Sequence, residues 1–262
     1  MKYLLITSDD FGMTLSVNRG IAHALIDGLV QATNLMVPCP WFSDAVVRVK
    51  EHGLPTGIHL TLTCEWDLYR WRSLTDCPSL RAGDGCLHSA YASISPEITE
   101  EEIFTEYAAQ LTELRRRGIE PTHADTHMLS AASAAPMELR VKAVVERFCK
   151  EEDLLFTYST TESGALRYFE SETMFSSLSV DGLKSILEHL GDGIHHVICH
   201  CAKPGDDLAA MCSTGHAARP WADTYRNEDY AAMMSPELRE FVDREKFELV
   251  NMKRVIELLK SR

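Results

Sequence analysis

Short apolar segments alternate with longer segments of helical periodicity along the 262 residues of the chain. The apolar segments are rich in β-forming residues, which is typical of buried strands. Eight strands are expected, at residues 3–7, 32–38, 56–62, 122–127, 155–159, 174–178, 195–200 and 247–250. Because a helical segment follows most of them, the pattern predicts βα units and a parallel sheet.

The helices expected between these strands have recognisable ends. The first carries an apolar stripe at four-residue spacing, made by Val17, Ile21, Leu25 and Leu29. Thr99 and Glu102 have the spacing of a capping box, and Gly118 would end that helix. Further helices are expected at residues 137–150, 181–190, 235–244 and 252–260. These elements predict an α/β fold, a single-domain (β/α) barrel over residues 1–262, with an irregular or incomplete barrel as the alternative.

Two long segments, residues 64–95 and 202–221, fit no helix or strand. Both are polar and rich in Gly, Pro, Asp and Ser, and each follows a strand that carries a histidine. Long loops in a compact domain usually serve as lids or binding walls. We expect lids.

Acidic and histidine side chains gather where four of the expected strands end. They are Asp9 and Asp10, His59, the group His123, Asp125 and His127, and His200. In a βα barrel the carboxyl ends of the strands converge on one face, where such folds place their active sites. These side chains are therefore expected to meet in space despite their separation along the chain.

One carboxylate and two imidazoles from different strands make a competent site for a divalent metal ion. Oxygen and nitrogen ligands of this kind admit Mg, Zn, Co or Mn. Non-haem iron oxygenases use the same donors, so ligand type leaves hydrolysis and oxidation both open. The second acid of the Asp9–Asp10 pair favours hydrolysis, because hydrolysis needs a base beside the attacking water. Alternatively, one aspartate caps the helix that follows.

Composition narrows the expected partners and location. The formal net charge of −13 would repel phosphate backbones and anionic lipids, so neither nucleic acid nor membrane is expected as a partner. The apolar stretch after Lys2 is too short for a signal peptide, which favours a cytoplasmic location. The eight cysteines include no CxxC pair and indicate reduced thiols, although Cys199 and Cys201 leave a soft-metal site open.

Four motifs in this order resemble the YdjC-type carbohydrate deacetylases, whose bacterial chitooligosaccharide deacetylases are the best understood members, and more distantly the NodB-type polysaccharide deacetylases. The resemblance spans nearly the whole chain. The motifs are Ser8-Asp9-Asp10-Phe11-Gly12, Gly57-Ile58-His59-Leu60-Thr61-Leu62-Thr63, Pro121-Thr122-His123-Ala124-Asp125-Thr126-His127, and Cys199-His200 before Pro204-Gly205.

The resemblance implies a metal-dependent deacetylase with one divalent metal ion and a small carbohydrate as substrate. It implies Asp10, His59 and His127 as metal ligands, Asp9 as general base and His200 as general acid. Substrate contacts are expected from Asp125, Thr61 and Arg226, although Arg226 could equally form a structural ion pair. Whether the protein forms a homodimer is left open by the sequence.

The chain departs from the family pattern in two places. Met128 follows His127 where the family usually has further histidines, and an insertion separates His200 from Pro204. Both departures lie outside the expected metal ligands, so they bear on specificity and rate. They leave two alternatives open: another metal-dependent hydrolase or oxygenase on the same scaffold, and a catalytically silent carbohydrate-binding protein.

Overall fold

The computed structural model describes residues 1–129, 133–157, 166–169, 178–211 and 222–261. Its strands are β1 (Lys2–Phe11), β2 (Ala32–Leu35), β3 (Thr56–Leu60), β4 (His123–Thr126), β5 (Leu155–Phe156), β6 (Leu166–Phe169), β7 (Gly193–Cys199) and β8 (Phe247–Leu249). Its α-helices are α1 (Leu15–Ile26), α2 (Phe42–His52), α3 (Glu100–Arg116), α4 (Pro136–Glu151), α5 (Val180–Glu188), α6 (Asp206–Met211), α7 (Thr224–Met233), α8 (Pro236–Arg244) and α9 (Met252–Lys260).

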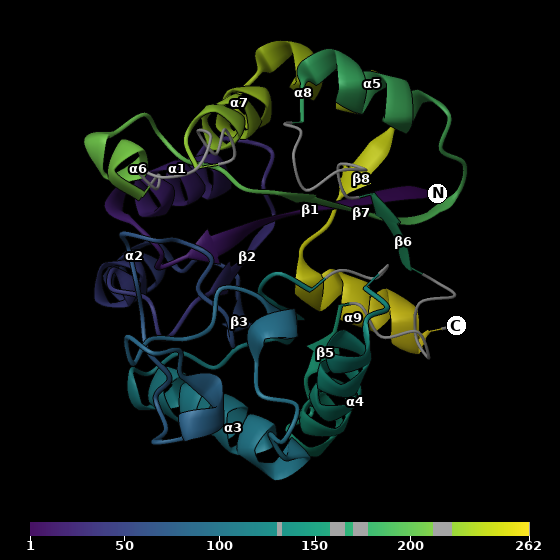
Figure 1. Ribbon diagram of the computed structural model, residues 1–262. Coiled ribbons are helices and arrows are strands. Elements are labelled where there is room, and N and C mark those ends of the chain that lie inside the picture. The colour runs from purple at the N-terminus through teal and green to yellow at the C-terminus, as the bar shows by residue number, and fades with distance from the viewer. Residues whose placement is uncertain (130–132, 158–165, 170–177, 212–221, 262) are drawn as a thin grey trace.

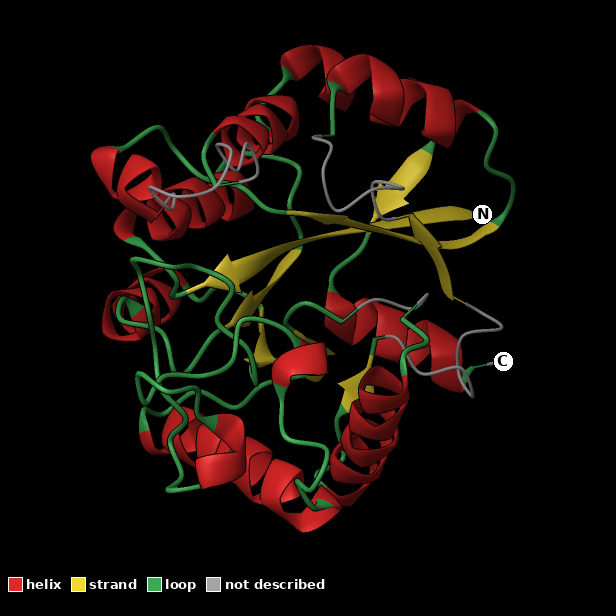
Figure 2. Cartoon of the chain, in the orientation of Figure 1, coloured by secondary structure: helices red, strands yellow, loops and turns green. Residues whose placement is uncertain are grey.

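All strand pairs are parallel, and the sheet runs β5-β4-β3-β2-β1-β7-β6. The sheet is curled, with helices around its outer side (Figure 1; Figure 2). Within the described residues no hydrogen bonds join β5 to β6, so the sheet forms a half-barrel open at that side. The predicted α/β fold is confirmed, in its irregular and incomplete form.

Strand β1 pairs with three other strands of the sheet, β2, β7 and β8. One edge pairs with β7 from Lys2 to Ser8. The other edge is divided, because β8 pairs with Lys2 to Leu4 while β2 pairs from Thr7 onward. The first and the last strand of the described residues, β1 and β8, therefore lie side by side in one sheet.

Helix α9 closes the amino-terminal end of the half-barrel. Its residues Met252 and Val255 pack with Leu5 of β1, Ala32 of β2 and Ile194 of β7 in a separate apolar cluster. Each of these strand residues lies in the amino-terminal half of its strand, which leaves the carboxyl ends free of this helix.

Within the described residues most predicted elements are confirmed, while three α-helices and one strand there were not predicted. Thr99 and Glu102 form the predicted capping box of α3. Helices α2 and α7 were not predicted, and α6 interrupts the expected loop at 202–221, whose last ten residues lie outside the described part. The strand expected at 174–178 lies almost wholly outside the described residues, and β6 precedes it. No helix in the described ranges is long and apolar enough to cross a membrane.

The segment 64–95 is a packed wall, not the expected lid. It contains two short 3-10 turns, at Pro78–Leu80 and Tyr91–Ser93, and several of its side chains belong to the main core. Trp66 and Trp71 are almost fully buried there. Apolar residues scattered through a polar sequence supply this burial, and they follow no helical or strand period.

A buried histidine on β7 predicts acid sensitivity of the fold. His196 is fully buried and its Nε2 lies 2.8 Å from the Thr7 hydroxyl, and burial lowers its pKa to about 3. Below pH 6.5 the unfolded chain therefore binds a proton at His196 that the folded chain does not bind. The free energy of unfolding consequently falls as the pH decreases from about 6.5 to about 3. One such group contributes a slope of about 1.4 kcal/mol per pH unit.

We expect His196→Gln to reduce that slope by about 1.4 kcal/mol per pH unit between pH 6 and 4, as measured by urea unfolding. An unchanged slope in His196→Gln would show that His196 is charged in the folded protein.

Candidate metal centre

The end of β1 departs from regular strand geometry at the acidic pair. Its register with β2 shifts between Ser8 and Phe11, and Asp10 has a φ of 71°, in the left-handed region. Successive side chains of a regular strand point to opposite faces, and a bulge with a left-handed residue breaks this alternation. Asp9 and Asp10 are consequently both buried among the histidines. Thr14, not an aspartate, caps α1.

The structure brings Asp10, His59 and His127 together, as the sequence predicted. One donor atom from each lies within 4.8 Å of the others, and all three side chains are buried. Asp10 Oδ1 lies 3.4 Å from His59 Nε2 and 3.2 Å from His127 Nδ1. This oxygen is buried and has no hydrogen bond of good geometry. A carboxylate and two imidazoles converging in this way could hold a divalent metal ion.

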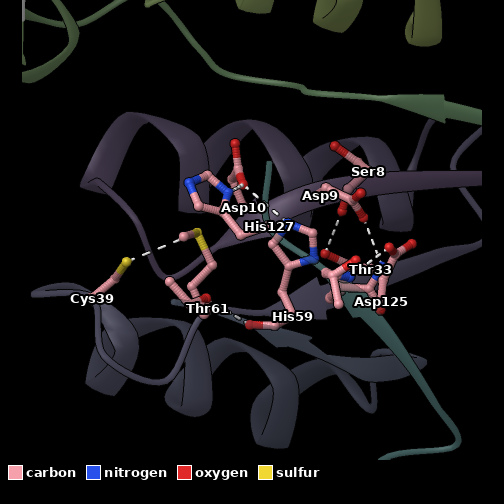
Figure 3. A network of polar contacts seen from close by, with 12 residues as sticks. Ser8, Asp9, Asp10, Thr33, Cys39, His59, Thr61, Asp125 and His127 are labelled. Atoms are coloured by element: carbon pink, nitrogen blue, oxygen red, sulfur yellow. Dashed lines mark hydrogen bonds and ion pairs between the residues drawn. The ribbon is translucent and has the colours of Figure 1, made fainter. Parts of the chain in front are cut away.

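A second group of possible donors, Asp9, His59 and Asp125, shares His59 with the first. Figure 3 shows His59 with Asp10 and His127 on one side and Asp9 and Asp125 on the other. Asp9 Oδ1 accepts a hydrogen bond from Asn34 Nδ2 at 2.6 Å. Asn34 comes from β2, and sequence reasoning did not identify it.

Arg226 of α7 holds the other oxygen of the Asp10 carboxylate. Its Nη2 lies 2.6 Å from Asp10 Oδ2, and the arginine is itself buried. Burial favours the neutral acid, but the charge of Arg226 and the facing imidazoles of His127 and His59 hold the pKa of Asp10 well below its usual range. Asp10 is therefore an anion with Oδ1 directed at the two histidines.

His127 has a second carboxylate on its far side. Its Nε2 lies 2.9 Å from Oε2 of the buried Glu65. Burial alone would lower the pKa of His127, but Glu65 and Asp10 raise it to about 10. Sequence reasoning missed Glu65, whose only signal was an acid in the segment just after β3.

The substrate-binding residues predicted beside the centre make internal contacts. Asp125 accepts hydrogen bonds from the Thr126 amide and the Thr157 hydroxyl, and Thr61 donates to the His59 carbonyl. Both side chains are fully buried. Their contact with a substrate stays a prediction.

His200 directly follows β7, next to β1. Ser8 of β1 pairs with Cys199, and the Cys201 amide donates to Ser8 Oγ at 2.9 Å, so the backbone of His200 lies between two residues that contact Ser8. Its side chain is exposed, and its amide donates to Asp229 Oδ2 at 2.8 Å. Burial raises the pKa of Asp229, and the nearby His200 partly opposes that shift.

The cysteines of the described residues are free thiols. Cys199 Sγ and Cys201 Sγ lie 3.7 Å apart and are buried. Neither belongs to a group of metal-binding donors found in the described part of the chain, so the soft-metal alternative gains no support there. Cys212 lies outside the described residues.

The fold and the site together define a parallel α/β half-barrel with a buried aspartate and two histidines at the carboxyl ends of its strands. The chain belongs to the YdjC-like protein family, whose model matches residues 3–244. This confirms the resemblance drawn from the sequence motifs.

Named relatives agree over nearly the full length. The chain is 28% identical to a carbohydrate deacetylase of Brevibacillus brevis over 259 residues, which cover 94% of this chain and 97% of that protein. A proposed cellobiose-phosphate cleavage protein from Enterococcus faecalis has the same fold, with a TM-score of 0.77 at 22% identity over 97% of this chain and 98% of that one.

A more distant structure shares the architecture. It is a family 4 acetyl xylan esterase from Clostridium thermocellum, solved with a cobalt ion. It aligns with a TM-score of 0.51 and 10% identity, over 98% of this chain and 91% of the esterase.

Proposed function

We propose that this chain is a metal-dependent hydrolase that removes the acetyl group from N-acetylated sugars. The expected substrates are mono- or oligosaccharides that contain N-acetylglucosamine. The observation that carries the proposal is the convergence of Asp10, His59 and His127 with a further carboxylate, Asp9, next to the shared His59. The carbohydrate deacetylase of B. brevis supports the choice of substrate class.

The donor set suits one divalent cation held by Asp10, His59 and His127. When bound, such a cation lowers the pKa of water and polarises a carbonyl group. Arg226 pairs with Oδ2 of Asp10 and so leaves Oδ1 for the cation. Zinc, cobalt, manganese and magnesium all accept this mixture of oxygen and nitrogen.

The residues around the centre can supply the two proton transfers of amide hydrolysis. Asp9, which accepts a hydrogen bond from Asn34, would take a proton from the water that attacks the carbonyl carbon of the acetyl group. His200 would donate a proton to the sugar nitrogen as the carbon–nitrogen bond breaks, leaving an amino sugar and acetate. The exposed position of His200 allows it to meet a substrate entering from solvent.

Acetate release tests the proposal directly. Metal-free protein reloaded with Zn²⁺, Co²⁺, Mn²⁺ or Mg²⁺ is expected to release acetate from N-acetylglucosamine or its short oligomers, and to lose that activity again with a chelator. An oxygen-dependent activity with Fe²⁺ and no acetate would replace the proposal with an oxygenase. Sugar binding by the metal-loaded protein without turnover would instead indicate a silent carbohydrate-binding protein.

A further inference from the structure

The two ring nitrogens of His127 face different carboxylates. Nδ1 faces Asp10 Oδ1, which is part of the candidate metal centre, and Nε2 faces Glu65 Oε2. A neutral imidazole donates from one nitrogen and accepts at the other, whereas an ionised carboxylate only accepts. When a cation beside Asp10 takes the place of one ring proton, the carboxylate at Nε2 favours keeping the other proton on Nε2, which leaves the lone pair of Nδ1 for the cation.

Glu65 is not itself placed as a ligand. The converging donor groups found among the described residues are Asp10–His59–His127 and Asp9–His59–Asp125, and Glu65 belongs to neither. Its contact is on the side of the imidazole that faces away from Asp10. It occupies the position of a carboxylate that orients a metal-binding histidine from behind.

The backbone on both sides of Glu65 is fixed by hydrogen bonds. The Cys64 amide donates to the His88 carbonyl at 2.8 Å. Arg70 Nη1 donates to the carbonyls of Cys64, at 2.6 Å, and Trp66, at 2.8 Å. Glu65 is thus held between two anchored residues, and its side chain is 7% exposed.

The same segment restrains the imidazole ring from a second direction. The Trp71 ring packs at a steep angle to His127, with ring centroids 6.1 Å apart. Trp71 Nε1 donates to the Thr63 carbonyl at 3.0 Å, which ties the tryptophan to the residues just before Glu65. One loop therefore supplies both a hydrogen-bond acceptor and a packing surface for His127.

We propose that Glu65 is a positioning residue that selects the Nε2–H tautomer of His127 and so presents Nδ1 to the cation. This rests on the metal centre of the proposed function. Arg226 has the matching role for Asp10, since it binds Oδ2 and leaves Oδ1 facing the histidines. The donor Arg226 thus orients the acceptor Asp10, and the acceptor Glu65 orients the donor nitrogen of His127.

Metal titration of the metal-free protein by calorimetry tests the role of Glu65. Glu65→Gln and Glu65→Ala are expected to bind Zn²⁺ about 10- to 100-fold more weakly than wild type. The matched control is Glu106→Gln. Glu106 is a fully buried glutamate that accepts from the amides of Leu74 and Thr75 and lies in α3. The control is expected to bind Zn²⁺ as wild type does, whatever its thermal stability.

Nitrogen chemical shifts of His127 in the Zn²⁺-loaded wild-type protein test the same inference without any variant. The expected result is a proton on Nε2 and zinc on Nδ1. Zinc on Nε2, or wild-type affinity in both Glu65 variants, would overturn the inference while leaving acetate release intact. A wild-type protein that binds no divalent metal would instead overturn the proposed function.

Discussion

Asp9→Asn is expected to lower kcat for acetate release by about 10²- to 10⁴-fold while the metal dissociation constant changes little, because loss of a general base has effects of this size. Asparagine has the same shape and can still meet Asn34, which holds Asp9 Oδ1 at 2.6 Å. What it cannot do is accept a proton. Steady-state kinetics and calorimetric metal titration of the same preparation separate the two effects.

Asp125→Asn is the matched comparison for Asp9. Asp125 is the other carboxylate of the donor group that includes Asp9 and His59, and it accepts hydrogen bonds from Thr126 and Thr157. If Asp9→Asn is fully active and Asp125→Asn is not, the base is Asp125. Full activity in both variants would remove the general-base role from this group.

Asp10→Ala is expected to abolish metal binding and also to destabilise the protein by about 3–5 kcal/mol, because it leaves the buried charge of Arg226 without a partner. Loss of metal should be visible by calorimetry, and the destabilisation by chemical denaturation of the metal-free protein. Alanine also adopts a φ of 71° less readily than aspartate, whose short polar side chain can hydrogen-bond to the nearby backbone, and this adds a smaller penalty.

A second substitution separates the two consequences of losing Asp10. Asp10→Ala combined with Arg226→Met removes both buried charges and should recover much of the lost stability, yet it should still bind no metal. Recovery of metal binding in the double variant would mean that Asp10 is not a ligand. Failure to recover stability would mean that the Asp10–Arg226 pair is not the source of the penalty.

The gathering of the candidate ligands could be predicted because it depends only on strand order and strand ends. Asp10, His59 and His127 each lie where a short apolar segment becomes polar, and parallel strands bring such positions to one edge. The parallel α/β sheet followed from the alternation of strands and helices, whereas the opening between β5 and β6 did not. Neither inference required knowledge of a particular side-chain contact.

Glu65 was not identified from the sequence, and Arg226 was named as a substrate contact or part of an ion pair but without its partner, because nothing periodic marks these contacts. Glu65 lies in the irregular segment just after β3, and Arg226 reaches Asp10 across 216 positions of sequence. The left-handed conformation of Asp10 also has no sequence signal, since a non-glycine residue adopts it only under the constraint of its surroundings. Helix α2 was missed although Gly53, with a φ of 62°, marks its end.

The divided edge of β1 has a consequence for how the chain acquires its structure. A ribosome makes β1 before β7 and β8, and the pairing of β1 is complete only when these two strands, nearly 200 residues and more later, have emerged. Contacts between such distant segments make folding slow, since long loops must close before the contacts form. The apolar residues Leu4, Leu5 and Ile6 are buried in the folded chain and lack part of their cover until β7 and β8 are made, so we expect a nascent-chain chaperone to bind at β1.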